Sequence, residues 1–325
     1  MLYALNVWFN PIYNEDTDIV NRGSIGTSRR LARVQRQAAL FITGAFQTSA
    51  TDVTEAHAKL LPIAQCAQTL CHRAALRIAA HPQSHPLHPL IRRAAKRYVK
   101  RHRSSLHHLT HAFRLKPSTI ETIQPMRCDP SSQTPFRTVI PDSKEDSIRE
   151  HNRITTGTKV YTDGSGFEGG IGASAILIRP NHKPRKTRYH LGTDKEHTIF
   201  EAGAVGLMMA AYMLYAERDI ELPIHIFIDN QAAIKSGDSL FSKPSHYLID
   251  RLLRLIRAVK KKHSCTTEDI MVQWVTGHKD IQGNMLADKE AKRAATDLHS
   301  TSSIMRLPPY LRESSLPLSV SALLQ

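Results

Sequence analysis

The stretch that decides the fold spans residues 158–178 and reads TKVYTDGSGFEGGIGASAILI. Two parts of it, Lys159–Thr162 and Ile171–Ile178, are rich in β-branched and apolar residues, which favours two strands. The Gly169-Gly170 pair between them is a turn signal. A third segment of the same type follows at Arg185–Leu191. The sequence therefore predicts three consecutive antiparallel strands here.

Helices alternate with strands after this meander. The run of apolar and small residues at 197–216 predicts a buried helix, and the apolar stretch Ile224–Ile228 predicts a buried strand. The remaining periodic segments predict a helix, a strand and a last helix, at 247–262, 271–275 and 284–296. The order β-β-β-α-β-α-β-α is typical of an α/β domain with a mixed sheet.

Four carboxylates lie at positions where a charged side chain is not needed for the stability of the fold. Asp163 ends the first strand and Asp229 directly follows the strand at 224–228, and open α/β sheets place ligand sites at the carboxyl ends of strands. Glu201 lies near the start of the apolar helix, and Asp288 lies in the last helix. Singly, each could be a turn residue or a helix cap. Brought together, they would need a divalent cation, and an all-oxygen ligand set favours Mg²⁺ or Mn²⁺ over Zn²⁺.

The segments around these carboxylates resemble type I ribonuclease H. The resemblance covers about residues 158–299 and rests on four segments in the same order as in that family, namely YTDGS at 161–165, Glu201 in an Ala/Gly-rich helix, IDNQAA at 228–233 and WVTGHKDIQGNMLAD at 274–288. It implies a ribonuclease H-like α/β fold, in which helices flank a five-stranded mixed sheet of order 3-2-1-4-5. It also implies that the four carboxylates converge at one end of that sheet.

The same resemblance implies an activity and a set of roles. The expected reaction is hydrolysis of the RNA strand of RNA–DNA hybrids with two Mg²⁺ ions, or Mn²⁺, as cofactor. The ions would be held by Asp163, Glu201, Asp229 and Asp288, and His278 would assist the attacking water or product departure. Substrate contacts would come from the neighbouring residues Gly164, Ser165, Asn230, Gln231 and Asn284. The alternative is a catalytically inactive remnant that still binds nucleic acid.

Positive charge is concentrated in the N-terminal third. The chain carries a net charge of +15, and residues 1–116 hold 17 Lys or Arg against 5 Asp or Glu. Within residues 91–116, which contain no acidic residue, helical spacing would align basic side chains in two rows, Arg92, Lys96 and Lys100 beside Arg93, Arg97 and Arg101. Such a helix would either contact the phosphate backbone of a nucleic acid or be an ordinary solvated surface.

The composition divides the chain into four parts. Residues 1–116 are expected to form a helical basic region, 117–157 a Pro-rich polar linker with partial order, 158–299 the ribonuclease H domain and 300–325 a tail without recognisable chemistry. Three segments of the first part, RVQR at 33–36, ITGAF at 42–46 and LPI at 61–63, resemble the region after the polymerase in non-LTR retrotransposon polyproteins, whose C-terminal end carries a ribonuclease H. No Tyr-x-Asp-Asp polymerase signature occurs in the sequence.

Neither a membrane span nor a secretory signal is predicted. The longest apolar run, Ala202–Ala216, is shorter than the roughly 20 residues that a membrane span needs. The first residues lack a basic flank followed by an apolar stretch. The four cysteines, at positions 66, 71, 128 and 265, lack metal-ligand spacing, which is typical of reduced thiols. An intracellular protein of the nucleus or cytoplasm is expected, and the sequence indicates no oligomeric state.

Overall fold

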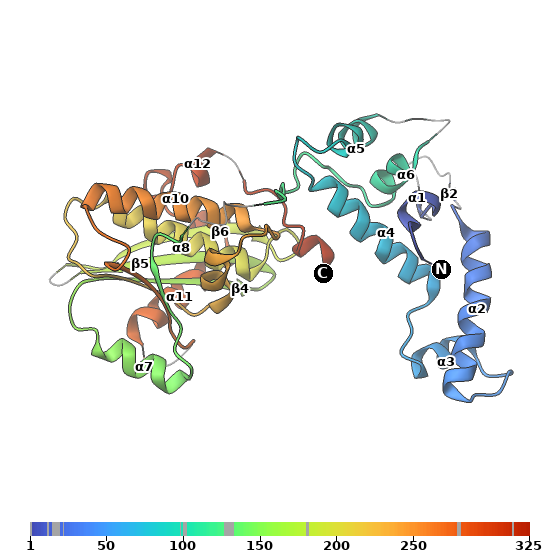
Figure 1. Ribbon diagram of the computed structural model, residues 1–325, viewed down its shortest axis with the longest axis horizontal. Helices are drawn as coiled ribbons and strands as arrows, with labels where there is room; N and C mark the ends of the chain where they lie inside the picture. Colours follow the sequence, from blue (N-terminus) through green and yellow to red (C-terminus); the bar gives the residue numbers. More distant parts are fainter. Residues whose placement is uncertain are drawn as a thin grey trace. The chain divides into compact units, whose positions relative to one another are not determined.

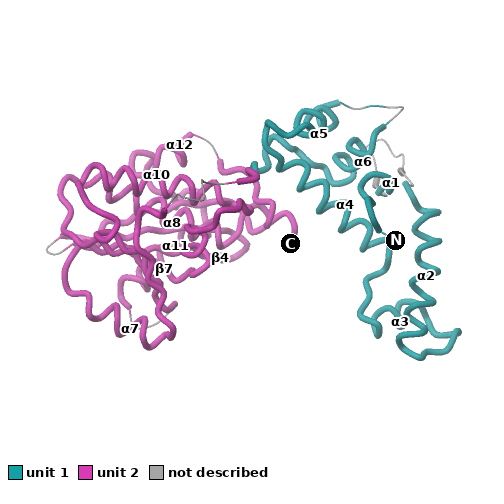
Figure 2. The backbone as a smooth tube through the Cα atoms, viewed as in Figure 1, with its two compact units in different colours: residues 1–122 teal, residues 123–325 magenta. Residues whose placement is uncertain are grey.

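The computed structural model describes residues 2–11, 13–14, 20–21, 23–97, 99, 103–126, 133–179, 182–277, 281–313 and 315–325. The chain forms two compact units, Met1–Thr122 and Ile123–Gln325 (Figure 2). They are called unit 1 and unit 2 below.

Unit 1 is helical, as the sequence predicts. Its elements are α1 (Leu5–Trp8), the strand pair β1 (Tyr13–Asn14) and β2 (Val20–Asn21), α2 (Ile25–Thr43), α3 (Thr51–His57), α4 (Ile63–Ala79), α5 (Leu87–Lys96) and α6 (Ser105–Ala112). A small core forms around α4, where the fully buried Cys71 and Ala75 pack with Leu5, Phe9 and Leu109. Burial in this apolar cluster raises the pKa of the Cys71 thiol to about 11, so the thiol is protonated at neutral pH.

The predicted cationic helix across residues 91–116 is not continuous. Helix α5 ends at Lys96, and the backbone of Arg97 is extended. Arg93 and Lys96 therefore lie in the last turn, where positive side chains interact favourably with the helix dipole. Lys100 and Arg101 lie outside the described residues. The two predicted basic rows therefore cannot both run along α5.

Unit 2 is built on a six-stranded mixed sheet in the order β3-β8-β7-β4-β5-β6. Its strands are β3 (Arg137–Val139), β4 (Thr158–Phe167), β5 (Gly170–Ile178), β6 (Arg185–Thr193), β7 (Ile224–Ile228) and β8 (Ile270–Trp274). β4, β5 and β6 form the antiparallel meander, and β7, β8 and β3 add to β4 in parallel. The predicted order 3-2-1-4-5 is confirmed as β6-β5-β4-β7-β8, and β3 is a sixth strand beside β8.

The segment expected to be a linker carries regular structure. It contains β3 and the helix α7 (Lys144–Arg153), whose first turn is capped by the Ser143 hydroxyl accepting from the Asp146 backbone N–H. Ser147 on α7 donates to the carbonyl oxygen of Trp274 at 3.3 Å and accepts from the Thr276 N–H at 3.2 Å. These bonds attach the segment to the end of β8. The sequence does not reveal this order, because the segment is rich in prolines and polar residues and β3, with only three residues, is too short to show a pattern.

Helices cover both faces of the sheet (Figure 1). α8 (Ile199–Ala216) packs on β4 and β5, and α10 (His246–His263) packs on α8. α11 (Gln282–Thr296) lies across β4, β5 and β6. Adjacent residues of β4 show that these are opposite faces, since Tyr161 contacts Gly283 of α11 whereas Thr162 contacts Gly206 of α8. The short helix α9 (Gln231–Lys235) follows β7.

α8 is the central core helix of unit 2. Among the described residues, it is the one helix long and apolar enough to cross a membrane, and 72% of that span is buried inside the structure. Small residues allow the close packing, and a side chain at Gly206 would meet the Ser174 carbonyl oxygen at 3.1 Å. This burial is what the core helix of a folded domain requires, so the length of α8 is weak evidence for a membrane span.

The C-terminal tail completes the same core. Leu307, Leu311 and Leu316 are buried in one cluster with residues of α8 and α10. The short helix α12 (Tyr310–Glu313) places the Tyr310 ring 3.4 Å from the Arg251 guanidinium carbon. The tail is therefore part of the packing of unit 2. The sequence showed no chemistry in it because its role is apolar burial.

A buried histidine on β7 makes the stability of unit 2 depend on pH. The His225 side chain is 4% exposed, and its Nδ1 lies 2.9 Å from Nε2 of Gln273 on the neighbouring β8. Burial, aided by the charges of Lys159 and His151, lowers the pKa of His225 from 6.5 to about 4. The folded protein therefore keeps His225 neutral at pH values where the unfolded chain takes up a proton.

We expect the free energy of unfolding to fall as the pH drops from about 6.5 to about 4, by roughly 3 kcal/mol for this one group. His225→Gln should flatten this dependence, because glutamine does not titrate and can still bond to Gln273. Urea unfolding followed at several pH values measures the effect. His299→Gln, at an exposed position, is the control and should keep the wild-type slope. An unchanged slope in His225→Gln would show that His225 is not the responsible group.

Candidate active site

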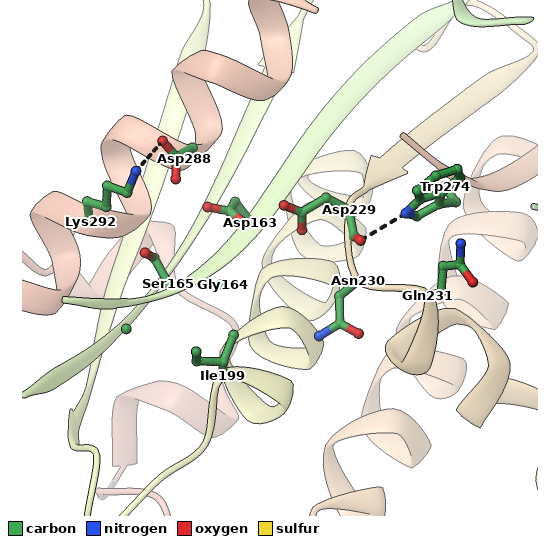
Figure 3. A pocket seen from close by; sticks show the side chains of 11 residues that line it. Asp163, Gly164, Ser165, Ile199, Asp229, Asn230, Gln231, Trp274, Asp288 and Lys292 are labelled. Atoms are coloured by element: carbon green, nitrogen blue, oxygen red, sulfur yellow. Dashed lines mark hydrogen bonds and ion pairs between the residues drawn. The ribbon is translucent and has the colours of Figure 1, made fainter. Parts of the chain in front are cut away.

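Three aspartates meet at one end of the sheet of unit 2. Thr162 of β4 pairs with Ile228 of β7 in parallel register, so the next residues, Asp163 and Asp229, lie side by side. α11 crosses β4 and brings Asp288 to the same place. Figure 3 shows the Asp163 side chain between those of Asp288 and Asp229. The topology thus gathers carboxylates that are far apart in the sequence.

These aspartates line an open pocket. It is formed by the end of β4, the loop after β7 and the start of α8, together with residues of β8 and α11, and its lining residues are Asp163, Gly164, Ser165, Gly166, Ile199, Asp229, Asn230, Gln231, Trp274, Asp288 and Lys292. Of the predicted substrate contacts, Gly164, Ser165, Asn230 and Gln231 are therefore present in the pocket.

The Asp163 carboxyl is buried among negative charges. Its side chain is 4% exposed. Burial raises the pKa of Asp163 to about 8, with further contributions from the negative charges of Asp229 and Asp288 and from a hydrogen bond with Asp229. A backbone hydrogen bond from Gly164 acts in the opposite direction. The arrangement penalises the ionised form, so a bound cation would relieve the repulsion among the three carboxylates.

The other two aspartates are held by neighbours. Asp288 Oδ2 lies 2.8 Å from Nζ of Lys292, one helical turn further along α11. The indole N–H of Trp274 donates to the backbone oxygen of Asp229 at 2.9 Å and fixes the end of β7 (Figure 3). Sequence reasoning missed Lys292 and Trp274 as site residues. The i, i+4 spacing of Asp288 and Lys292 was the available signal for the first of them.

Glu201 does not line this pocket. It occupies the third position of α8, where one of its oxygens accepts from the Thr198 backbone N–H at 2.8 Å. The Thr198 hydroxyl in turn accepts from the Glu201 N–H at 3.3 Å, which completes a capping box. The second oxygen, Oε1, lies 3.6 Å from Nδ1 of His197. Both side chains are almost completely buried. The structure thus places Glu201 at the helix cap.

The remaining predicted site residues lie elsewhere or outside the described part. Asn284 is buried at the start of α11, with its Nδ2 at 3.5 Å from the Thr276 carbonyl oxygen, and it does not line the pocket. This contact suits Asn284 to a structural role, in which it holds the chain segment that follows β8. His278, with Lys279 and Asp280, lies outside the described residues.

The donor chemistry of the pocket fits a hard divalent cation. Three carboxylates with polar Ser165 and Asn230 beside them form an oxygen-rich set, which suits Mg²⁺ or Mn²⁺. Among the described residues, no group of three or more His, Cys, Asp or Glu side chains already has the arrangement of a metal site. Asp288 is paired with Lys292, and Asp163 with Asp229. Binding a cation would therefore require these side chains to exchange partners.

Comparison with known proteins identifies the domain. Residues 155–296 match the family model described as RNase H, so an RNase H domain occupies this part of the chain. The mixed sheet flanked by helices is accordingly an RNase H-like fold. No curated protein matches the chain significantly.

Several solved structures resemble part of the chain. The N-terminal RNase H domain of a Mycobacterium tuberculosis protein, solved as a fusion with maltose-binding protein, is 16% identical with a TM-score of 0.31 and covers 43% of this chain and 98% of its own. RNase H1 of the halophilic archaeon Halobacterium salinarum NRC-1 is 16% identical with a TM-score of 0.29 and covers 42% and 96%. LC11-RNase H1 in complex with an RNA/DNA hybrid is 12% identical with a TM-score of 0.32 and covers 42% and 98%.

Proposed function

We propose that unit 2 is a metal-dependent endonuclease that hydrolyses the RNA strand of RNA–DNA hybrids. The observation that carries this proposal is the convergence of Asp163, Asp229 and Asp288 in the pocket of an RNase H domain. A cluster of carboxylates at the point where two parallel strands stop pairing is a suitable place for cations that bind a phosphodiester. Because the substrate would be a phosphodiester, the expected partner is a nucleic acid, the RNA–DNA hybrid.

The three aspartates would hold Mg²⁺, or Mn²⁺ in its place. When bound in pairs, such cations supply an activated water and stabilisation of the leaving oxygen in an in-line phosphodiester displacement. Gly164 lines the pocket with its backbone, and its missing side chain lets the α8 backbone lie directly against β4. Ser165 and Gln231 offer hydrogen-bonding groups at the pocket for the sugar edge of the hybrid, where the 2′-hydroxyl distinguishes RNA from DNA.

A cleavage assay tests this proposal directly. The full chain is incubated with end-labelled RNA–DNA hybrid, RNA duplex and DNA duplex, each with Mg²⁺ and with EDTA. We expect cleavage of the hybrid's RNA strand alone and only with Mg²⁺. Cleavage that persists in EDTA, or equal cleavage of all three duplexes, would contradict the proposal.

A second function is favoured by the position of Glu201. Because this carboxylate caps α8 and does not line the pocket, the site has one acidic ligand fewer than the sequence resemblance implies. An RNase H fold of this kind could bind hybrids without cutting them. Hybrid binding in EDTA combined with no cleavage in Mg²⁺ or Mn²⁺ would identify that non-catalytic module.

His278 is proposed as an auxiliary group, on the basis of its place after the Trp-Val-Thr-Gly segment. We expect His278→Ala to slow turnover by about 10- to 100-fold while measurable cleavage remains, because a proton-transfer or product-release role is less critical than metal binding. Single-turnover kinetics on labelled hybrid measure the change, with His299→Ala as the control. Complete loss of cleavage would show that His278 is essential to the reaction.

A further inference from the structure

We infer that the metal site of this chain is built from three aspartates, Asp163, Asp229 and Asp288. Glu201 serves only as the cap of α8. The position from which α8 faces the site is Gly203. This inference rests on the proposed function, because it specifies which residues hold the cation. It assigns a structural role to a carboxylate that the sequence resemblance places in the metal shell.

The geometry of α8 separates the two positions. Ile199 lines the pocket, and Gly203 lies four residues further on, so both belong to one face of the helix. Glu201 lies two residues from each of them, and two residues turn an α-helix by about 200°. A side chain at position 201 therefore leaves the helix on the side away from the face that carries Ile199 and Gly203.

The contacts of Gly203 place it directly against the pocket. A Cβ atom at residue 203 would lie 3.3 Å from Nδ2 of Asn230, the residue after Asp229. A Cβ at Gly164, the residue after Asp163, would lie 2.3 Å from the Gly203 backbone nitrogen. Gly203 thus touches the residues that follow two of the three aspartates. A side chain from this position would point toward Asn230, which lines the pocket next to Asp229.

The contacts of Glu201 keep it away from the pocket. Its Oε2 accepts from the backbone and the hydroxyl of Thr198, and its Oε1 faces the buried His197. Its side chain is 0% exposed. Reaching the aspartates would break the capping box and leave the Thr198 N–H without its acceptor inside the protein, which is unfavourable. The cap is therefore the stable role of this carboxylate.

Three variants of the full chain separate the roles. Glu201→Gln keeps the hydrogen-bonding shape of the cap, since glutamine also serves in capping boxes, but removes the charge that a metal ligand needs. Gly203→Glu adds a carboxylate at the position facing the site, and Gly203→Gln is its uncharged match of equal size. Asp229→Asn is the reference for losing a ligand. Mn²⁺ affinity, measured by calorimetry, is the first readout, and hybrid cleavage is the second.

We expect Glu201→Gln to bind Mn²⁺ within about twofold of the wild type, and Gly203→Glu to bind it at least about tenfold more tightly because the site gains a negative ligand. Gly203→Gln should show no such gain. If Glu201→Gln weakens Mn²⁺ binding as much as Asp229→Asn does, or if Gly203→Glu binds no better than Gly203→Gln, the inference is wrong.

Failure of the proposed function gives a different result. In that case the Mn²⁺ affinities of the variants follow the expected order, but neither the wild type nor Gly203→Glu cleaves the hybrid. Melting temperatures measured alongside confirm that each variant is folded. A folded Gly203→Glu that binds no Mn²⁺ counts against the inference, since a fourth carboxylate at this position should strengthen the site.

Discussion

Asp229→Asn should reduce cleavage of the RNA–DNA hybrid by at least about 100-fold, because it removes a charge that would bind the catalytic cation and stabilise the reacting phosphate. Asparagine has nearly the shape of aspartate. The backbone oxygen of residue 229, which accepts from the Trp274 indole, is unaffected by the change. The loss of cleavage should therefore come from a slower reaction and not from unfolding of the variant.

Stability measurements separate these two possibilities. Removing the Asp229 charge also removes repulsion of the buried Asp163 carboxylate, so the metal-free variant should unfold at a temperature no lower than that of the wild type. Asp219→Asn, at an exposed position of the same unit, is the matched control and should retain full activity. Near-normal cleavage by Asp229→Asn at saturating Mg²⁺ would exclude Asp229 as a metal ligand.

The strand arrangement and two of the carboxylates could be predicted because they depend on local patterns. Asp163 is predicted to end the first strand, but β4 continues to Phe167, and it is the parallel pairing with β7 that stops at Thr162. Asp229 directly follows β7, so the shared register still places Asp163 and Asp229 side by side. Asp288 is predicted from the resemblance of residues 274–288 to ribonuclease H, and it lines the pocket. For the two strands, the alternation of side chains fixes which face of the sheet a residue occupies.

The position of Glu201 could not be predicted in the same way. Within an apolar helix such as α8, nearly every position is buried, so composition does not reveal which face meets the pocket. A shift of two residues moves a side chain to the opposite side of the helix. The Thr198-x-x-Glu201 spacing was nevertheless visible as a capping box, and it was the signal for the role that the structure gives Glu201.

The segments before and after the RNase H domain were difficult for another reason. β3 and the tail residues Leu307, Leu311 and Leu316 are too short or too irregular to show a period. Their order depends on partners distant in the sequence, such as β8 for β3 and α8 for the tail leucines. Tertiary contacts of this kind cannot be deduced from a local pattern.

Gly172→Ala should strongly destabilise unit 2. A Cβ at this position of β5 would lie 2.3 Å from the Ala295 nitrogen and 2.4 Å from the Ala291 oxygen, both backbone atoms of α11. Backbone atoms cannot rotate away as a side chain does, so α11 must move off the sheet. Overpacking of this kind costs about 3 kcal/mol, and the melting temperature should fall by roughly 10 °C.

The displacement should also reduce activity, because α11 carries Asp288 to the pocket. Gly166→Ala is the matched control for stability in the neighbouring strand β4, since a Cβ there meets only side-chain carbons at 3.4 Å, an ordinary contact distance. Thermal unfolding is measured for both variants, and hybrid cleavage is measured for Gly172→Ala against the wild type. If Gly172→Ala has the same melting temperature as Gly166→Ala, α11 does not pack on β5 as closely as the structure shows. If it melts earlier yet cleaves normally, the position of Asp288 does not depend on that packing.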